Sequence, residues 1–426
     1  MEVREPSAKY LAKPAYKQTE VGLIPEDWDV GPLSRVAEIR GGIAKNSNVE
    51  ASDPISVHYL RVANVQDGFL DLSEMSKIQL SRHDLKRYTV LPGDVLMNEG
   101  GDLDKLGRGA IWHGEFNPCV HQNHVFVVRC KPALLPDYLN AWTATSSARR
   151  FFLLAGKQTT NLASISKSSL AELPVAVPPI PEQRAIAAVL SDVDALLDGL
   201  ERLIAKKRGL KQAAMQQLLT GQTRLPGFSD KWELKRLGDV ADALKGSGLS
   251  KGRLTLSGAR PCLLYGELFT TYTRVIRTVV SRTDSCDGCT SVSGDVLLPG
   301  STTTSGMDLA TASALLKDGV ALGGDINVIR RRGNDYDPEF LANYLTSVMR
   351  KQIAELTQGI TIHHLYGRNL KALTLKLPSL PEQTAIAAVL SDMDAELSAL
   401  VARRDKTRDL KQAMMQELLT GRIRLV

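Results

Sequence analysis

The chain has 426 residues, of which 43% are apolar and 23% are charged, and its formal net charge is +6. A chain of this length is expected to form two or more domains, each large enough to bury a core. The mild positive charge is consistent with an anionic partner but does not establish one. The sequence has no run of about 18 uncharged apolar residues, so we expect no membrane span.

The N-terminal segment, residues 1–22, lacks the apolar stretch of a secretory signal. Five cysteines are few for this length and odd in number, which favours reduced thiols in a cytoplasm. Cys286 and Cys289 form a CxxC pair, but no second pair completes a four-ligand zinc site. We therefore expect a soluble cytoplasmic protein without a bound metal.

Residues 23–178 are expected to form a first mixed α/β domain. The run HVFVVRC (124–130) is rich in β-branched residues and predicts a strand. The longer segment DYLNAWTATSSARRFF (137–152) has the pattern of a helix. There is little βαβ regularity, so the domain is assigned to the α+β class.

A long helix is predicted within residues 179–222. Pro181 suits a first helical turn, and Gly221 suits the left-handed position that ends a helix. An apolar seam with 3–4 spacing, interrupted at Lys207, predicts a coiled coil. Its expected members are Ile186, Val189, Val193, Leu196, Leu200, Leu203, Leu210 and Ala214.

Residues 223–378 repeat the framework of the first domain. Trp28, Leu33 and Val36 align with Trp232, Leu237 and Val240, and GDVL occurs at both 93–96 and 294–297. The runs 273–280 and 326–332 are β-rich, and 339–356 is helix-like. Because framework positions recur while the intervening segments diverge, we expect two domains of one fold with different binding loops.

A second long helix is predicted within residues 379–426. Between Pro181 and Leu225, about 29 of 45 positions are identical to those 200 residues later, and such a repeat governs the whole architecture. The expected seam is Ile386, Val389, Met393, Leu400, Leu410 and Met414. It is broken at Glu396, Arg403 and Thr407, with Leu397 beside the break.

Both helices are acidic in their early half and basic in their late half. The first runs from Asp192, Asp194, Asp198 and Glu201 to Lys206, Lys207, Arg208 and Lys211. The second runs from Asp392, Asp394 and Glu396 to Arg403, Arg404, Lys406, Arg408 and Lys411. Opposite charges face each other when the helices are antiparallel, so an antiparallel intramolecular pair is predicted. Small residues at both helix starts permit close approach of a partner, and the expected contacts are Ala185, Ala188, Val189, Ala385, Ala388 and Val389.

Several ordered motifs resemble the DNA-specificity (S) subunits of type I restriction–modification systems, over essentially the whole chain. They are KQTEVGLIPEDW, YLRVANVQDG, LMNEGGDLDKLGRGAIW, VPPIPEQRAIAAVLSDVDALL with its counterpart LPSLPEQTAIAAVLSDMDAEL, and LKQAAMQQLLTG with LKQAMMQELLTG. The resemblance implies two target-recognition domains that each read one half of a split sequence in double-stranded DNA. It also implies that the helices set the spacing and dock two methylation subunits, which bind S-adenosylmethionine, with restriction/translocase subunits joining through the complex.

The resemblance places readout on loops that enter the major groove, where Arg and Lys suit guanine and Asn and Gln suit adenine. Candidates in the first domain are Arg61, Asn64, Arg82, Lys86, Arg87, Asn98, Lys105, Arg108, Gln122 and Asn123. Candidates in the second domain are Lys251, Arg253, Arg260, Tyr265, Tyr272, Arg274, Arg277, Thr302, Thr303, Thr304 and His363. Many of the basic residues are expected to contact phosphate, which positions a domain without specifying sequence.

No catalytic residue or cofactor of this chain is predicted. His121 and His124, near His113, raise the alternative of a metal-dependent nuclease, but if they lie on a strand they point to opposite faces. A glycine-rich cofactor loop and an Asn/Asp-Pro-Pro-aromatic motif, which a methyltransferase needs, are both missing from the sequence. The other alternative is a free-standing DNA-binding regulator with duplicated domains, which would bind its site without a methylation subunit.

Overall fold

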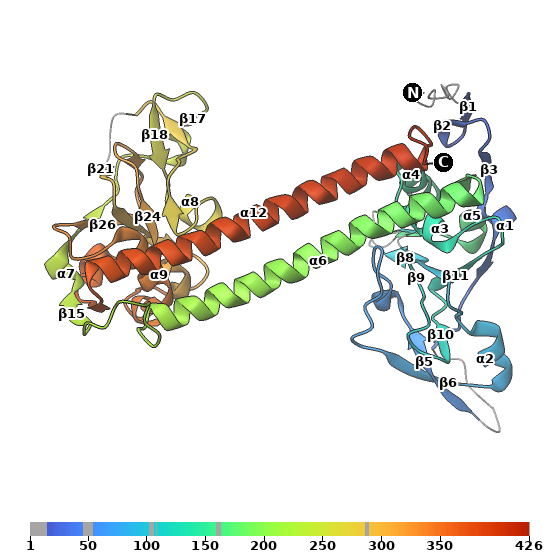
Figure 1. The fold of residues 1–426 in the computed structure, drawn as a ribbon, viewed down its shortest axis with the longest axis horizontal. Coiled ribbons are helices and arrows are strands. Elements are labelled where there is room, and N and C mark those ends of the chain that lie inside the picture. Colours follow the sequence, from blue (N-terminus) through green and yellow to red (C-terminus); the bar gives the residue numbers. More distant parts are fainter. Residues whose placement is uncertain are drawn as a thin grey trace, which may run out of the picture. The chain divides into compact units, whose positions relative to one another are not determined.

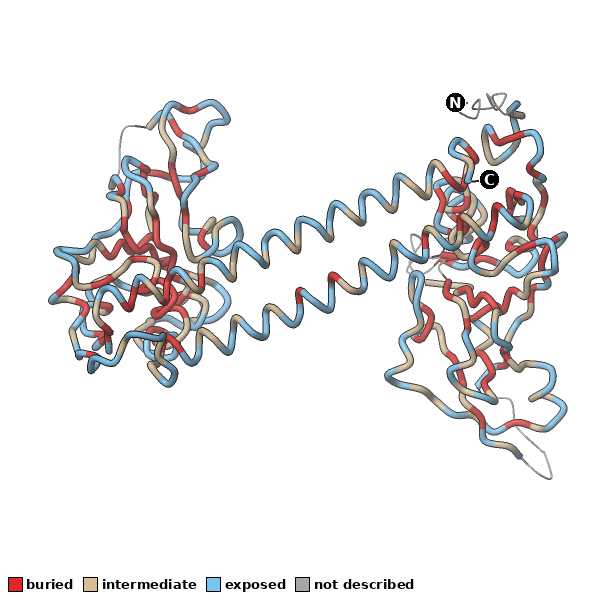
Figure 2. Tube along the Cα trace, in the orientation of Figure 1, coloured by how far each residue is buried: buried red, intermediate tan, exposed pale blue. Residues whose placement is uncertain are grey.

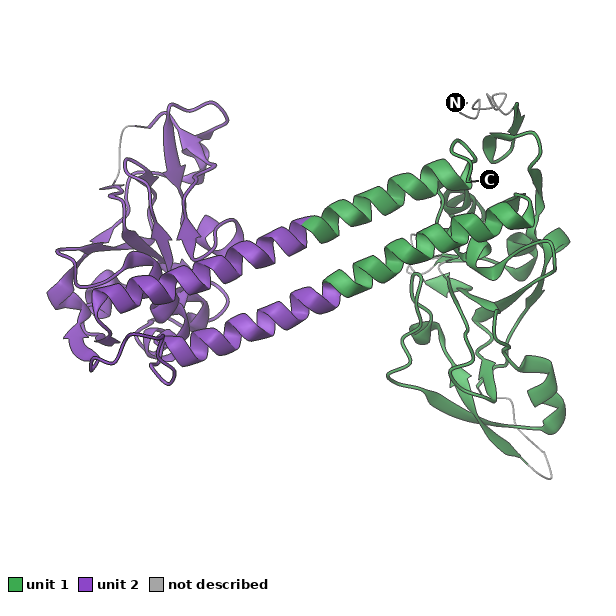
Figure 3. Cartoon of the chain, in the orientation of Figure 1, with its two compact units in different colours: residues 1–200, 403–426 green, residues 201–402 purple. Residues whose placement is uncertain are grey.

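The structure is a computed structural model that describes residues 15–45, 54–101, 106–107, 109–158, 163–285 and 289–425. Two long helices, α6 (Ile180–Leu218) and α12 (Leu380–Leu419), accompany mixed α/β parts (Figure 1). The chain divides into two compact units (Figure 3). The first unit runs to Leu200 and resumes at Arg403, and the second is Glu201–Ala402. Each unit thus combines one mixed α/β part with half of each long helix.

The first unit contains small sheets around a four-stranded one. The four-stranded sheet has the order β4 (Ala37–Arg40), β11 (Val125–Cys130), β7 (Val95–Asn98), β9 (Gly109–Ile111). A second sheet is β10 (Cys119–His121), β5 (Ile55–Leu60), β6 (Ser76–Leu80), and a third is β12 (Lys157–Gln158), β13 (Ala163–Ser164), β8 (Gly100–Gly101). Two further pairs are β1 (Tyr16–Thr19) with β2 (Gly22–Pro25), and β3 (Asp29–Pro32) with β14 (Pro174–Val177). The shorter helices are α1 (Leu33–Val36), η1 (Val62–Asn64), α2 (Arg82–Tyr88), α3 (Pro136–Thr143), α4 (Ser146–Ala155) and α5 (Lys167–Ala171).

The second unit repeats this plan with longer sheets. One five-stranded sheet has the order β16 (Ala241–Lys245), β26 (Ile326–Arg331), β22 (Asp295–Pro299), β24 (Ser313–Leu315), β19 (Val275–Ile276). The other is β17 (Leu254–Thr255), β20 (Arg282–Thr283), β18 (Arg260–Leu263), β25 (Ala321–Leu322), β21 (Cys289–Thr290). The remaining pairs are β15 (Glu233–Arg236) with β28 (Thr374–Leu377), and β23 (Ser301–Thr302) with β27 (His363–His364). Its shorter helices are α7 (Leu237–Val240), η3 (Lys251–Arg253), α8 (Glu267–Thr270), η4 (Gly306–Ala310), α9 (Pro338–Ser347), α10 (Arg350–Glu355) and α11 (Gly367–Leu370).

Each unit has a core into which the ends of both long helices are packed. In the first unit, Ile186 and Leu190 from the start of α6 join Leu418 and Leu419 from the end of α12. In the second unit, Leu218 and Leu219 join Ile386 and Leu390. Burial is concentrated in these mixed parts, and the middle of each long helix is largely exposed (Figure 2). The α+β class with two similar domains is confirmed.

The long helices begin and end where the prolines and glycines predict. Gly221 and Gly421 have φ of +71° and +68°, the left-handed conformation that follows a helix end. The helices pair antiparallel, as their charge gradients predict. In the second unit Lys207 contacts Glu396 at 2.6 Å and Lys211 contacts Asp394; in the first unit Lys411 contacts Asp194 at 2.5 Å.

The predicted seam is wrong in phase for part of its length. Leu196, Leu203 and Leu210 are 43%, 38% and 49% exposed, and Leu410 is 56% exposed. The residues that face inward on α6 are Leu190, Val193, Leu197, Leu200, Ile204, Lys207 and Lys211, and on α12 Leu397 takes a seam position beside the predicted break. The reason is that buried residues at both ends, namely Glu182, Gln183 and Ile186 at the start and Leu218 and Leu219 at the end, fix the rotation of the helix, and this rotation sets which residues of the middle face inward.

Several predicted elements are confirmed and others are interrupted. The runs 124–130 and 326–332 form β11 and β26, but of 273–280 only Val275–Ile276 is a strand. The segments 137–152 and 339–356 each form two helices instead of one. The first break lies at Thr145, whose hydroxyl accepts a hydrogen bond from the amide of Ala148 and so starts a new helix.

Candidate nucleic-acid interface

The repeated GDVL segments form the same buried support in both units. Asp94 is 1% exposed and accepts two hydrogen bonds from Arg129, at 2.7 and 2.6 Å, and one from the amide of Leu91 at 2.7 Å. Asp295 does the same with Arg330, at 2.9 and 2.7 Å, and with the amide of Val292. A buried carboxylate is stable when it is paired in this way, so these aspartates hold the sheet and are not free to read DNA.

Loops converge at one edge of the main sheet in each unit, which we call the loop edge. In the first unit it comprises residues 41–43, 98–101 and 122–124; in the second, 245–247, 299–302 and 323–325. At the loop edge the backbone of Gly42 packs directly against the backbone of His121. A Cβ added to Gly42 would lie only 2.2 Å from the carbonyl oxygen of His121, so no larger residue fits. Gly246 takes the same place in the second unit, where an added Cβ would lie 2.0 Å from the carbonyl oxygen of Gly323. The GG and GS sequences thus allow two strands to cross closely at the loop edge.

The structure brings four predicted residues together beside the loop edge of the first unit. Asn98 donates to the carbonyl oxygen of Val65 at 2.9 Å, and Gln122 accepts from the amide of Val62 at 3.3 Å. Asn123 lies 3.3 Å from the ring of His124. Asn64, in contrast, is 3% exposed, and its amide group bonds the backbone of Arg61, Asp71 and Glu74. Asn64 therefore shapes the turn that carries this group.

The other predicted residues of the first unit are basic. Arg61 donates to the carbonyl oxygen of Glu74 at 3.2 Å. Arg82, Lys86 and Arg87 are exposed on α2, and the Arg87 guanidinium lies over the ring of Tyr88 at 5.2 Å. Lys105 and Arg108 lie outside the described residues.

In the second unit, strands β23 and β27 bring predicted residues from distant parts of the chain side by side. Thr302 pairs with His363, and the Thr302 hydroxyl lies 2.9 Å from that of Thr304. Thr304 also donates to Asp308 at 2.6 Å, and Thr303 is exposed between them. This group is adjacent to the loop edge and is the counterpart of the β8–β13 pair in the first unit.

The remaining predicted residues of the second unit are dispersed. Lys251, Arg253 and Arg260 line the region of β17 and β18, where Arg253 donates to Ser285 at 3.2 Å, and Tyr265 is 39% exposed nearby. Tyr272 is half-buried and accepts from the amide of Val280 at 3.0 Å. Arg277 pairs with Glu339 at 2.8 Å. Arg274 is half-buried, and burial lowers the pKa of its guanidinium.

The residues predicted to bind a protein partner lie at the start of each long helix. Ala188 and Ala388 are exposed, and Ala185 and Ala385 are half-buried. Val189 and Val389 pack against the cores of their own units, so only part of each side chain remains available. Exposed Leu196, Leu203 and Leu210 continue along α6 at seven-residue intervals, which places them on one face.

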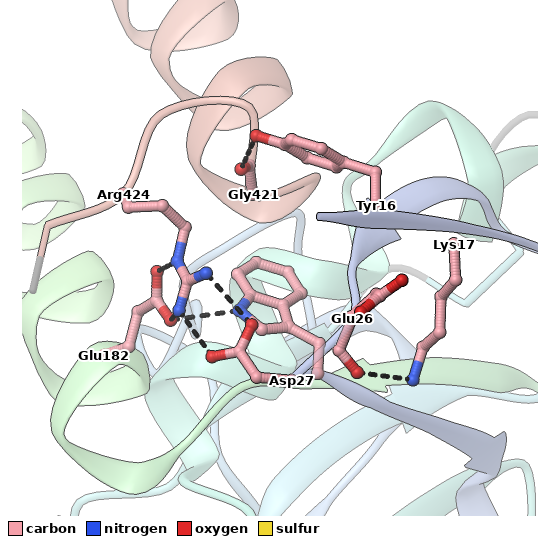
Figure 4. Close-up of polar contacts among 8 residues, drawn as sticks. Tyr16, Lys17, Glu26, Asp27, Glu182, Gly421 and Arg424 are labelled. Atoms are coloured by element: carbon pink, nitrogen blue, oxygen red, sulfur yellow. Dashed lines mark hydrogen bonds and ion pairs between the residues drawn. The ribbon is translucent and has the colours of Figure 1, made fainter. Parts of the chain in front are cut away.

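The end of α12 is held to the first unit by a polar junction (Figure 4). Glu182, which is fully buried, accepts from Arg424 at 2.5 and 2.8 Å and from the indole nitrogen of Trp28 at 2.9 Å. Arg424 also bonds Asp27 at 3.0 and 2.8 Å, and this hydrogen bonding holds the pKa of Asp27 below its usual range. Tyr16 donates to the carbonyl oxygen of Gly421 at 3.0 Å.

The end of α6 is held to the second unit by the equivalent junction with fewer bonds. Fully buried Glu382 accepts from Arg224 at 2.5 and 2.6 Å. Lys231 stands where the first unit has Asp27, and the buried indole nitrogen of Trp232 has no partner among the described residues. The two copies therefore share the acid–arginine pair and differ in what surrounds it.

A glutamine follows each of these glutamates in both copies and ties the helix start to the adjacent chain. Gln183 bonds the backbone of Leu135, Ala133 and Pro178 at 2.8–2.9 Å. Gln383 makes the matching bonds in the second unit. Sequence reasoning missed these junction residues as a site. The available signal was the identity of charged residues at both helix ends, where surface residues usually diverge.

The histidines and cysteines do not form a metal site in the described part of the chain. His121 is the last residue of β10 and is buried, whereas His124 lies in the turn before β11 with its side chain 56% exposed, so no single strand carries both histidines as the prediction assumed. No group of three or more His, Cys, Asp or Glu that could hold a metal ion occurs among the described residues, and Cys286 lies outside them. Within the same ranges, no helix is both long and apolar enough to cross a membrane.

The duplication seen in the fold corresponds to two matches to the model of one protein family. The family model described as "Type I restriction modification DNA specificity domain" matches residues 25–207 and again 229–406. The chain belongs to this family and contains two copies of its domain. Specificity subunits of type I systems are non-catalytic, and the enzymatic activities reside in other subunits.

Individual relatives match either nearly the whole chain or about half of it. The putative type I restriction enzyme MjaX specificity subunit of Methanocaldococcus jannaschii is 25% identical over 432 residues, which cover 96% of this chain and 97% of the relative. The EcoKI specificity subunit of Escherichia coli is 24% identical over 196 residues, or 44% of this chain and 41% of the relative. The type I S subunit from M. genitalium has a similar fold, with a TM-score of 0.55, 13% identity, and coverage of 92% and 96% of the two chains. A chain of a type I R-M system solved to explain complex assembly and conformational transition has a TM-score of 0.57 at 14% identity, with coverage of 94% and 99%.

Proposed function

We propose that this chain reads a DNA sequence made of two separated halves, one half by each unit. The two target-recognition domains are assigned to residues 23–178 and 223–378, and the helical spacers to 179–222 and 379–426. The observation that carries the proposal is a shared framework with unlike loop edges. The buried pairs Asp94–Arg129 and Asp295–Arg330 are the same, whereas the loop edges carry different polar side chains.

The candidate DNA contacts are the predicted residues that the fold leaves accessible near the loop edges or on basic surfaces. In the first unit, Asn123 at the loop edge is proposed to contact bases, and Arg82, Lys86 and Arg87 on α2 to contact phosphate. In the second unit, Thr302, Thr303 and His363 are proposed as base contacts, with Lys251 and Arg253 on phosphate. Phosphate contacts set orientation and base contacts set sequence, so the two classes differ in their expected mutational effects.

The partners proposed are two methylation subunits that bind S-adenosylmethionine, with restriction/translocase subunits recruited through the same complex. The faces around Ala188 and Ala388 support this because small exposed residues allow a partner helix to approach closely. Leu196, Leu203 and Leu210 extend that face with exposed apolar surface on α6. The proposed location is the cytoplasm, where the DNA and the methylation subunits meet.

The proposal is tested by selection from a random pool of DNA duplexes. The full chain is purified with a methylation subunit from the same system, and the bound duplexes are sequenced. Two short conserved blocks with a fixed gap are expected. A single continuous block, or binding without any sequence preference, would contradict the proposal. Equal affinity and preference for the chain alone would instead indicate a free-standing DNA-binding protein.

A further inference from the structure

Strand register makes Asp325 in the second unit the counterpart of His124 in the first. Val95 pairs with Val128 as Val296 pairs with Ile329, in strands that begin with the same GDVL sequence. Counting back along β11 and β26 from these pairs places His124 and Asp325 at the same position, just before each strand. The same count places Glu99 opposite Gly300 and Gly100 opposite Ser301.

Equivalent backbone positions at the loop edges therefore present different chemistry. In the first unit, the His124 ring lies 2.8 Å from the carboxylate of Glu99. In the second unit, the Asp325 carboxylate accepts from Ser301 at 3.2 Å and lies 3.5 Å from the ammonium group of Lys245. The buried ion pairs at the other ends of these strands, Asp94–Arg129 and Asp295–Arg330, are alike, so the two units share this framework and differ in the side chains at the loop edge.

Asp325 is held in an unusual conformation. Its φ is +59°, and it is the non-glycine residue with positive φ in the described part of the chain. Left-handed backbone is uncommon for residues other than glycine, and such residues cluster at functional sites. The carbonyl oxygen of Asp325 accepts from the amide of Gly300 at 2.5 Å, so the backbone is fixed. The side chain is 45% exposed.

Asp325 and Lys245 lie where two pockets meet. One pocket, of about 490 Å³, continues past His364, Tyr366 and Arg368. The other, of about 940 Å³, continues past Lys251 and Tyr265. His364 stacks on Tyr366 with 6.2 Å between ring centroids, and Arg368 covers the same tyrosine at 5.2 Å. Basic and aromatic groups therefore flank the one carboxylate that lines both pockets at this point.

The Asp325 carboxylate is held by weak bonds, unlike the buried Asp295. Lys245 is 67% exposed at its side chain, and an ion pair of this kind contributes little to stability. Lys245 can therefore turn to a phosphate when DNA approaches, which leaves Oδ1 of Asp325 free to accept from a base while Ser301 still donates to Oδ2. In the major groove, the N4 amino group of cytosine is the donor that suits a carboxylate.

We propose that Asp325 is a specificity-determining residue that reads one cytosine of the half-site bound by the second unit, while Lys245 contacts a neighbouring phosphate. This inference rests on the proposed function and assigns it to residues that the sequence did not mark. The counterpart His124 gives the first unit a different reader at the same backbone position. The two half-sites differ at that position for this reason.

The test uses the full chain assembled with its methylation subunit and a set of duplexes with each base at every half-site position. The variant is Asp325→Asn, because asparagine tolerates left-handed backbone and suits adenine. The matched control is Asp242→Asn on the same strand as Lys245, which removes the carboxylate paired with Arg332. We expect Asp325→Asn to lose about five- to hundredfold discrimination for cytosine at one position and to favour adenine there. Lys245→Gln should weaken binding to all duplexes equally.

Two results would overturn the inference. One is unchanged base preference in Asp325→Asn at all positions of the half-site. The other is an equal loss of binding to all duplexes, which would make Asp325 a positioning residue. The wild-type complex separates this inference from the proposed function. If the wild-type complex shows no preference for a split sequence, the proposed function fails. If it prefers a split sequence and Asp325→Asn leaves that preference intact, only the role of Asp325 is refuted.

Discussion

At the scale of single residues, Glu182 and Glu382 show how one sequence motif is used twice with different partners. Both carboxylates are fully buried and take two hydrogen bonds from an arginine at the end of the other long helix. Breaking a buried pair leaves an uncompensated charge, which is strongly destabilising. The motif therefore fixes where each helix ends on its unit. The extra donor from Trp28 makes the first junction the better satisfied of the two.

This difference predicts unequal costs for the same substitution at equivalent sites. Trp28→Phe removes a hydrogen bond to a buried carboxylate and is expected to cost about 1–3 kcal/mol more than Trp232→Phe. Trp232→Phe removes an indole N–H that has no partner among the described residues. Both variants lose the same ring volume, so the difference between their costs isolates the hydrogen bond of Trp28. Chemical denaturation followed by circular dichroism measures the two costs. An equal or larger cost at Trp232 would show that the bond to Glu182 contributes nothing.

His121 makes the first unit sensitive to acid. Burial lowers the pKa of its imidazole from 6.5 to about 4 in the folded chain. Between pH 6.5 and 4 the unfolded chain binds a proton at His121 that the folded chain does not bind. The stability that comes from keeping this imidazole neutral is therefore fully present above pH 6.5 and is lost as the pH falls to 4. The expected loss is about 3 kcal/mol.

The control is His121→Asn, which retains a donor for the carbonyl oxygen of Val125 but does not titrate in this range. Urea unfolding at pH 7, 5.5 and 4 compares the two proteins. Wild-type stability should fall more steeply than that of the variant across this window. Parallel pH profiles would show that His121 is not buried as a neutral imidazole.

At the scale of elements, the long helices were predictable in extent but not fully in rotation. Prolines, glycines and the charge gradient predict their ends and their antiparallel pairing, because those signals are local. Which residues of a long helix form the seam depends on the face that its two ends bury. At the start of α6 this face is set by Glu182, Gln183 and the core into which they pack. Several apolar residues then remain outside, including Leu196 and Leu203, so spacing alone could not choose between neighbouring registers.

Adjacent residues on α6 provide a direct test of the observed rotation. Ile204 is 3% exposed and Leu203 is 38% exposed. Ile204→Ala is expected to cost about 2–4 kcal/mol through lost burial and a cavity, and Leu203→Ala less than about 1 kcal/mol. Thermal denaturation gives the ranking. If Leu203→Ala were the more costly, the helix would be rotated to the phase that the sequence pattern predicts.

The candidate site was less predictable than the fold. The repeated framework identified the domains, and β23–β27 does bring Thr302 beside His363. Asp325 and Lys245 escaped notice because their significance comes from strand register and from pockets formed by segments far apart in the chain. Asn64 was chosen for its amide group, which the turn uses internally. Residue type alone does not separate a base contact from a capping group.

At the scale of the whole molecule, the duplicated helices are proposed to set the spacing between the half-sites. Removing four residues from α6 and the four that face them in α12 shortens each helix by about 6 Å, or nearly two base-pair steps. The gap in the recognised sequence should shorten, or binding should be lost if the half-sites rotate out of reach. Selection from random duplexes measures the gap. A normal affinity with an unchanged gap would show that the helices do not determine the spacing.

The central claim, that two unlike readers share one chain, is tested most directly by sequencing methylated bases in cells that express the chain with its methylation subunit. The expected result is one methylated motif split into two different short blocks by a gap of constant length. Exchange of residues 223–378 for those of a relative should change one block and leave the other and the gap unchanged. A continuous methylated motif, or a change in both blocks after the exchange, would contradict the two-reader interpretation.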